Sequence, residues 1–133
     1  MTVITRIGQA EAARAVAKGA ALMNREDPGW WRPDVDRAID LGALSLGSPN
    51  RCILGQRCPL AIRPPDDDED GGPYWAYALA LAGALPGETE DDRDYRVQVW
   101  ALEHGFEADQ WTVQYADLAA EWRRVISELR AAA

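Results

Sequence analysis

The Pro28-Gly29 pair constrains the fold of this chain more than any other feature, because a helix that arrives from upstream must end there. Proline lacks the amide donor that a helix needs, and glycine adopts backbone angles that other residues avoid. Trp30 and Trp31 follow directly. Burying one tryptophan removes roughly 200 Å² from water, which is worth several kcal/mol. Since neighbouring side chains point in different directions, we expect at most one of the two tryptophans to lie fully inside the core.

The stretch from residue 28 to residue 56 offers the apolar partner that the segments on either side need. Its apolar residues begin with helical spacing and end with alternation, which predicts a short helix over about residues 34–41 and then an extended or irregular arm. Asn50 is a candidate cap for a second short helix, which ends at Gly55 or at the Cys58-Pro59 step. We interpret the stretch as a loop-rich core segment. The alternative is a recognition surface that uses the exposed tryptophan.

Three other segments have the pattern of helices. The alanine-rich run from Gly8 to Asn24 has high helix propensity. Residues 73–83 are apolar nearly all round, which is typical of a helix at the centre of a core. Residues 112–129 carry an apolar stripe with spacings of three and four. The stripe consists of Tyr115, Leu118, Trp122, Val125, Ile126 and Leu129.

Residues 95–103 fit two patterns. Tyr95, Val97 and Val99 alternate as in a strand, whereas the residues from Val99 to Glu103 keep helical spacing and His104 is typical of a helix end. We predict a helix. Residues 1–133 are then one mostly α-helical domain, a small bundle with a loop-rich segment and acidic loops at 66–72 and 87–94. The alternative is an α+β fold with a short strand near 95–100.

We expect one core in which the last helix packs on the Trp30 region and on the helix at 73–84. Its predicted members are Trp30 or Trp31, Leu54, Trp75, Leu79, Leu118 and Trp122.

The negative charge of the chain is concentrated in one region. The net charge is −8, but residues 66–94 alone hold ten acidic residues against Arg93, a net charge of −9, and the remainder of the chain carries +1. Binding to nucleic-acid phosphate needs clustered lysine or arginine, so direct binding of nucleic acid is disfavoured. The ten acidic residues are Asp66, Asp67, Asp68, Glu69, Asp70, Glu88, Glu90, Asp91, Asp92 and Asp94.

A set of short motifs resembles a group of small proteins without an assigned activity, found in actinobacteria and especially in their phages. The motifs are Gly19-Ala20-Ala21-Leu22, Pro28-Gly29-Trp30, Ile39-Asp40-Leu41, Leu44-Ser45-Leu46, Cys52-Ile53-Leu54-Gly55-Gln56, Gly105-Phe106, and Leu118 with Trp122. The resemblance spans nearly the whole chain, but this sequence departs from the group in a long acidic insertion between Pro64 and Gly72. It implies an origin in a phage or mobile element rather than a reaction.

The chemistry-bearing residues do not form a recognisable reaction centre, and we expect neither catalysis nor a cofactor. Cys52 is interpreted as a small core residue, with a Cys52–Cys58 disulfide as the alternative, and two cysteines without a second pair make no zinc site. The acids from Asp66 to Asp70 match the opening of a calcium loop. The bidentate glutamate of such a loop should fall where Tyr77 stands, so we expect no metal.

These observations favour a non-enzymatic binding protein. The acidic region flanks an aromatic helix, and we predict a protein-binding surface made of the ten acids with Trp31 and Trp75 as anchors. Together with the resemblance, this suggests an inhibitor of a basic or nucleic-acid-binding host or defence protein, in which acids replace phosphates. The alternatives are acids that only keep a structural or regulatory domain soluble, and an immunity-type protein that neutralises a toxin.

The sequence has no window of about 18 apolar residues and no basic-then-apolar pattern at its N-terminus. We therefore expect a cytoplasmic protein that makes no membrane contact, as a monomer or a homodimer.

Overall fold

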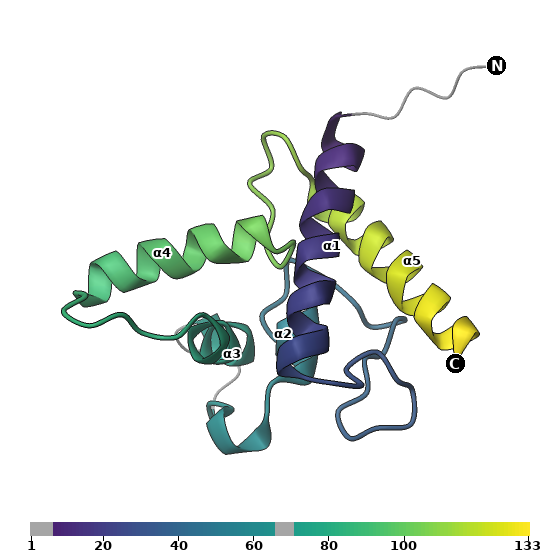
Figure 1. Cartoon of the computed structure of the whole chain (residues 1–133), viewed down its shortest axis with the longest axis horizontal. Coiled ribbons are helices and arrows are strands. Elements are labelled where there is room, and N and C mark those ends of the chain that lie inside the picture. The colour runs from purple at the N-terminus through teal and green to yellow at the C-terminus, as the bar shows by residue number, and fades with distance from the viewer. Residues whose placement is uncertain (1–6, 66–70) are drawn as a thin grey trace.

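The computed structural model describes residues 7–65 and 71–133, and over these residues the chain forms five α-helices, one short 3₁₀ helix and no strand (Figure 1). The elements are α1 Ile7–Glu26, α2 Ile53–Arg57, η1 Leu60–Ile62, α3 Gly72–Ala82, α4 Glu90–Glu103 and α5 Tyr115–Ala132. The mostly helical prediction is confirmed. The alternative strand near 95–100 is wrong, since those residues lie inside α4.

The start of α4 explains why a helix forms there. Thr89 is the N-cap, and its side-chain oxygen accepts a hydrogen bond of 3.1 Å from the backbone N–H of Asp92. Acidic side chains fill the first turn, where they complement the positive end of the helix dipole. The predicted acidic loop at 87–94 is therefore confined to its first three residues, and the rest is helix.

A cluster of aromatic rings holds α1, α5 and the end of α4 together. Trp30 and Trp122 are fully buried and meet edge to face with ring centroids 5.6 Å apart, and Phe106 stacks on Trp122 at 5.5 Å. The indole N–H of Trp122 donates to the carbonyl of Gly105 at 2.7 Å. Trp31 is only half-buried. Both the prediction of a single central tryptophan and the packing of Trp122 on the Trp30 region are confirmed.

The segment between α1 and α2 contains turns and no helix, so the helix predicted over 34–41 is wrong. Arg37 has a φ of +56°, which a right-handed helix excludes. The second short helix does form, as α2, and it ends at the Cys58-Pro59 step as predicted. Its N-cap, however, is Cys52, whose Sγ accepts a hydrogen bond from the Gly55 N–H, and not Asn50.

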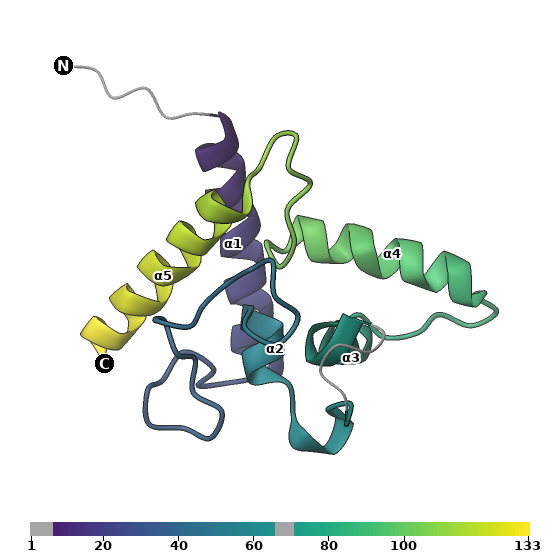
Figure 2. The same cartoon turned by 180° about the vertical axis from the view of Figure 1, so that it is seen from behind.

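Helix α3 lies at the edge of the core rather than at its centre. It packs on α2, on α4 and on η1. The predicted packing of the last helix on this helix is therefore not what the structure shows. Tyr77 and Ala78 are buried, but Trp75 and Leu79 are half-buried and only line the core. Seen from both sides, α1 lies between α5 and α4, and the N-terminal half of α4 extends away from the other helices (Figure 2). This projection leaves much of α4 exposed to solvent.

Candidate functional site

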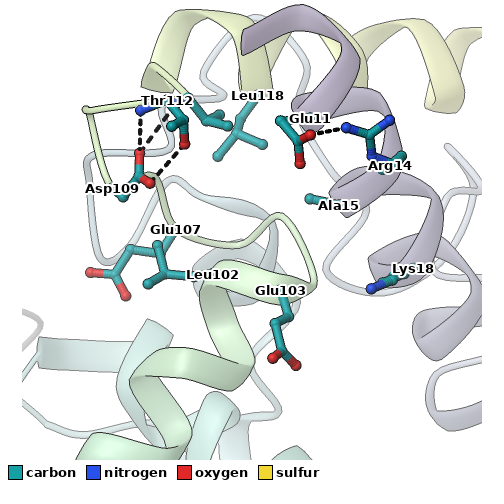
Figure 3. Close-up of a pocket in the computed structure, with 11 residues that line it drawn as sticks. Glu11, Arg14, Ala15, Lys18, Leu102, Glu103, Glu107, Asp109, Thr112 and Leu118 are labelled. Carbon is teal, nitrogen blue, oxygen red and sulfur yellow. Dashed lines mark hydrogen bonds and ion pairs between the residues drawn. The ribbon is translucent and has the colours of Figure 1, made fainter. Parts of the chain in front are cut away.

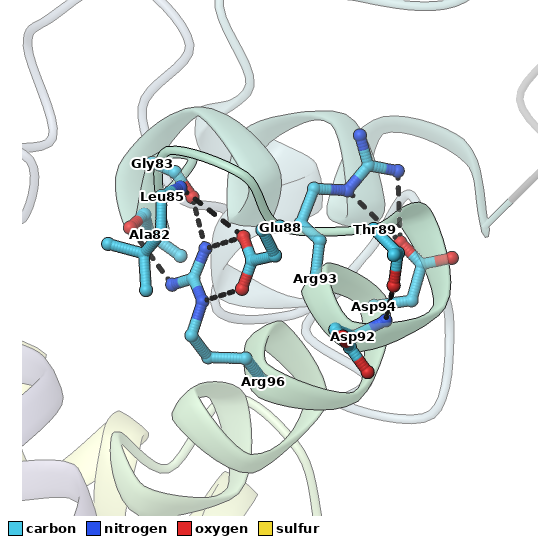
Figure 4. A network of polar contacts seen from close by, with 9 residues as sticks. All are labelled: Ala82, Gly83, Leu85, Glu88, Thr89, Asp92, Arg93, Asp94 and Arg96. Carbon is cyan, nitrogen blue, oxygen red and sulfur yellow. Dashed lines mark hydrogen bonds and ion pairs between the residues drawn. The ribbon is translucent and has the colours of Figure 1, made fainter.

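The predicted acidic surface divides into three parts. Asp66, Asp67, Asp68, Glu69 and Asp70 lie outside the described residues. Two further acids form ion pairs with arginine: Glu88 with Arg96, and Asp94 with the neighbouring Arg93 (Figure 4). The guanidinium of Arg96 donates hydrogen bonds to both carboxylate oxygens of Glu88, at 2.6 and 2.8 Å, and to the carbonyl of Gly83. These bonds fix the loop between α3 and α4. The hydrogen bond from Arg96 lowers the pKa of Glu88 below its usual value.

The third part is a group of free carboxylates. Glu90, Asp91 and Asp92 are exposed on the first turn of α4, and within the described part of the chain none of them has a basic partner. Tyr95, one turn further along, is 71% exposed, and Leu85 in the preceding loop is 56% exposed. We call these residues, Leu85, Glu90, Asp91, Asp92 and Tyr95, the acidic α4 surface.

The predicted aromatic anchors lie elsewhere. The carbonyl of Trp31 accepts a hydrogen bond of 2.8 Å from Arg130, near the C-terminus of α5, which lies on the opposite side of the molecule from the start of α4 (Figure 1). The guanidinium of Arg32 lies 5.2 Å from the Trp31 ring. Trp75 is on α3, half-buried beside Tyr74. The structure therefore does not bring Trp31 to the acids of α4, and Tyr95, one turn further along α4, takes that position.

A buried ion pair was not foreseen from the sequence. Arg57 holds both carboxylate oxygens of Asp27 at 2.7 and 2.9 Å, and the hydroxyl of Tyr77 donates to the same carboxylate at 3.1 Å. Burial and the Asp27 charge raise the pKa of Tyr77. The one available signal is an arginine that lies close to the end of the short apolar run Cys52-Ile53-Leu54. Because its donors are also bound to the carbonyls of Asp36 and Arg37, this group connects elements and offers no open ligand position.

The remaining reactive side chains are occupied or shielded. Cys52 and Cys58 are free and buried, so the disulfide alternative does not form. Burial raises the pKa of Cys52 to about 11, and its thiol stays protonated at neutral pH.

His104, at the C-cap of α4 as predicted, has Nδ1 2.7 Å from the carbonyl of Trp100. Over residues 7–65 and 71–133 no three ligand-type side chains are grouped in a way that could hold a metal ion.

The loop between α4 and α5 contains a feature that the sequence reading missed. Trp111 is 92% exposed, and next to it lies a pocket of about 290 Å³ between α1, the end of α4 and the start of α5 (Figure 3). The signal was the Asp109-x-x-Thr112 spacing, because aspartate hydrogen-bonds the backbone two to four residues onward and so forms a tight turn.

Comparison with protein-family models, with curated proteins and with solved structures finds no match for this chain. None of the described helices combines the length and the apolar character that crossing a bilayer requires.

Proposed function

We propose that this protein is a non-enzymatic binding protein whose acidic α4 surface attaches to a basic surface of another protein. The observation that carries the proposal is the position of three unpaired carboxylates and the exposed Tyr95 on the first turns of a helix that projects from the body, with Leu85 exposed in the loop before it. The resemblance to phage-associated proteins supports a target in the host or its defences. A nucleic-acid-binding protein fits best, because its phosphate-binding groove is basic.

In such an interface, charge sets the rate and orientation of encounter, and buried apolar contact sets the affinity. A localised negative potential accelerates encounter with a basic partner and aligns it, but exposed ion pairs contribute little affinity by themselves. Affinity comes mainly from desolvated anchors at the centre of an interface, where aromatic residues are enriched. Tyr95 supplies such an anchor one helical turn from Asp91 and Asp92.

A simpler account assigns the acids to helix stability alone. Glu90, Asp91 and Asp92 occupy the first turn of α4, where negative charge is favourable by about 0.3–1 kcal/mol per residue. This account gives no reason for the aromatic ring of Tyr95 to remain exposed one turn further along the same helix. The two accounts differ in what happens when the acids are neutralised, since only the binding account predicts the loss of a partner.

The test starts from a partner captured with the full chain from a high-GC bacterial lysate at low salt, purified, and titrated by calorimetry. The acid variant combines Glu90→Gln, Asp91→Asn and Asp92→Asn. The control variant removes three exposed acids from another face, through Glu26→Gln, Asp34→Asn and Asp36→Asn.

We expect the acid variant and a Leu85→Ser, Tyr95→Ser variant to weaken binding at least tenfold, which corresponds to about 1.4 kcal/mol. The control variant should bind like the wild type, added salt should weaken binding steeply, and short duplex DNA should compete. Equal affinity of the acid and control variants would exclude the acidic α4 surface as the binding site.

A further inference from the structure

Trp111 is held outward by a rigid turn. One carboxylate oxygen of Asp109 accepts hydrogen bonds from the backbone N–H groups of Trp111, Thr112 and Val113 at 3.0 to 3.1 Å. Its other oxygen accepts from the Thr112 hydroxyl at 2.8 Å, and the Gln110 N–H donates to the Val113 carbonyl. These bonds fix the backbone of Trp111, although its side chain contributes nothing to the core. A large apolar side chain displayed in this way loses little entropy when it is buried by a partner.

The pocket beside Trp111 has the volume for an indole ring and a lining that mixes apolar and charged side chains. Ala15, Leu102, Val113 and Leu118 provide apolar surface, and charged side chains surround it, with Arg14 paired to Glu11 (Figure 3). The charged residues are Glu11, Arg14, Lys18, Glu103, Glu107 and Asp109. An apolar cavity of about 150 Å³ holds a benzene ring, so a volume of about 290 Å³ leaves room for the two fused rings of tryptophan. The ammonium group of Lys18, on the α1 side of the pocket, can lie against the electron-rich face of an indole.

We propose that a second copy of this chain occupies the pocket, with Trp111 of each copy inserted into the pocket of the other. The pocket and the protruding side chain belong to one turn, since Asp109, Thr112 and Val113 line the pocket while Trp111 is 92% exposed. A protruding side chain directly beside a cavity that accepts it is what a two-fold symmetric interface requires, because both copies use the same patch.

This interface is separate from the acidic α4 surface. The pocket involves the C-terminal end of α4, at Leu102 and Glu103, whereas the acidic α4 surface is at its N-terminal end. The two interactions also respond to salt in opposite directions. Two chains of net charge −8 repel one another, so added salt should strengthen the dimer, while it weakens attachment to a basic partner.

Sedimentation equilibrium of the full chain tests the proposal. The wild type should change from monomer to dimer over roughly a hundredfold range of concentration, as mass action requires. Trp111→Ala removes the inserted side chain, and Ala15→Phe fills the pocket. Each variant alone should be monomeric in that range, with a circular-dichroism spectrum like that of the wild type. Should Ala15→Phe fail to fold, Lys18→Trp obstructs the pocket from an exposed position.

The decisive sample is an equimolar mixture of the Trp111→Ala and Ala15→Phe variants. In a mixed dimer, Trp111 of the second variant still enters the intact pocket of the first, so one of the two contacts remains. We expect the mixture to associate more than tenfold more tightly than either variant alone and less tightly than the wild type. A wild-type chain that stays monomeric at every concentration, or a mixture that associates no better than its components, would overturn the proposal.

Discussion

At the scale of single residues, polar groups with several simultaneous partners determine the local backbone. Asp109 is exposed, yet it binds three backbone N–H groups and one hydroxyl, and these hydrogen bonds lower its pKa from 3.8 to about 2. The buried indole N–H of Trp122 likewise has a partner in the carbonyl of Gly105. Both residues lead to predictions that a substitution can test.

The first prediction is a pH dependence that depends on Asp109. Because its pKa is lower in the folded chain, the ionised carboxylate stabilises the fold above pH 3.8, and this contribution is lost as the pH falls toward about 2. We expect Asp109→Ala to be less stable than the wild type at neutral pH, and the difference to shrink as the pH falls from 3.8 through about 2. Hydrogen exchange at the amides of residues 111–113 measures the effect locally. Asp34→Ala, an exposed acid without these hydrogen bonds, should show no such convergence.

The second prediction concerns Trp122, which is fully buried between Trp30 and Phe106. Trp122→Ala should destabilise the chain by about 3–5 kcal/mol, the usual cost of truncating a buried large aromatic residue. Trp111→Ala is the matched control, since it removes an equal volume from an exposed position. Guanidinium denaturation at a monomeric concentration compares the two. A loss for Trp122→Ala no greater than that of the control would contradict the assignment of the core.

At the scale of elements, arginine side chains hold the irregular segment in place of a regular hydrogen-bond ladder. Arg57 donates to the carbonyls of Asp36 and Arg37, Arg130 to those of Trp31 and Ile39, and Arg123 to that of Leu44. Buried or partly buried carbonyls need such partners when no helix or strand satisfies them. The segment between α1 and α2 is thus fixed by donors that lie far away in the sequence.

The third prediction follows from Arg57. Arg57→Ala leaves Asp27 without its ion-pair partner in a nearly buried position, and breaking a buried pair in this way costs about 3–5 kcal/mol. Arg51→Ala changes an exposed arginine of the same segment and should be nearly neutral. Chemical denaturation measures both. Similar stability losses for the two variants would show that the ion pair does not organise the segment.

The fourth prediction reverses an ordinary helix rule. Gly19 lies where α1 meets α5 and the end of α4, and an added Cβ would clash with the His104 carbonyl and lie 2.9 Å from the Trp122 ring. In an exposed helix glycine to alanine gains about 1 kcal/mol, but overpacking a core costs about 1–3 kcal/mol. We expect Gly19→Ala to lower the melting temperature. Ala17→Gly on the exposed face of the same helix should also lower it, through propensity alone, and a stabilised Gly19→Ala variant would refute the close approach.

At the scale of the whole molecule, charge and packing are segregated. The aromatic core joins α1, α5 and the C-terminal end of α4, while the unpaired acids of α4 lie at its projecting end (Figure 1). The acidic sequence at 66–70 adds charge without the ligand pattern of a complete calcium loop. The unpaired acids of α4 therefore lie away from the aromatic core.

The fifth prediction is that metal ions do not stabilise the protein. Calcium or zinc at micromolar concentration should leave the melting temperature unchanged, because a ligand stabilises a fold only if it binds the native state. The Asp66→Asn, Asp68→Asn, Asp70→Asn variant should melt like the wild type in the same buffer. A rise of several degrees that this variant abolishes would establish a calcium site in the acidic insertion.

The sequence by itself determined the elements whose cause is local. The alanine-rich run before Pro28, the apolar stripe that includes Leu118 and Trp122, and the acidic first turn of α4 each carry a periodicity or an end signal within a few residues. Helix propensity, capping and the helix dipole act over that range, so α1, α3 and α5 could be predicted almost to their bounds, whereas α4 begins at Glu90, inside the predicted acidic loop. The concentration of acidic charge in residues 66–94 likewise follows from the sequence alone.

Only the tertiary structure decided how the other residues are used. The turns at 34–41 depend on Arg57 and Arg130, and the choice of Trp30 over Trp31 as the buried tryptophan depends on the position of Trp122. The pocket beside Trp111 likewise arises only where α1, the end of α4 and the start of α5 meet. The physical reason is the same in each case, since burial and long-range hydrogen bonds join residues tens of positions apart, and local sequence patterns carry no record of those partners.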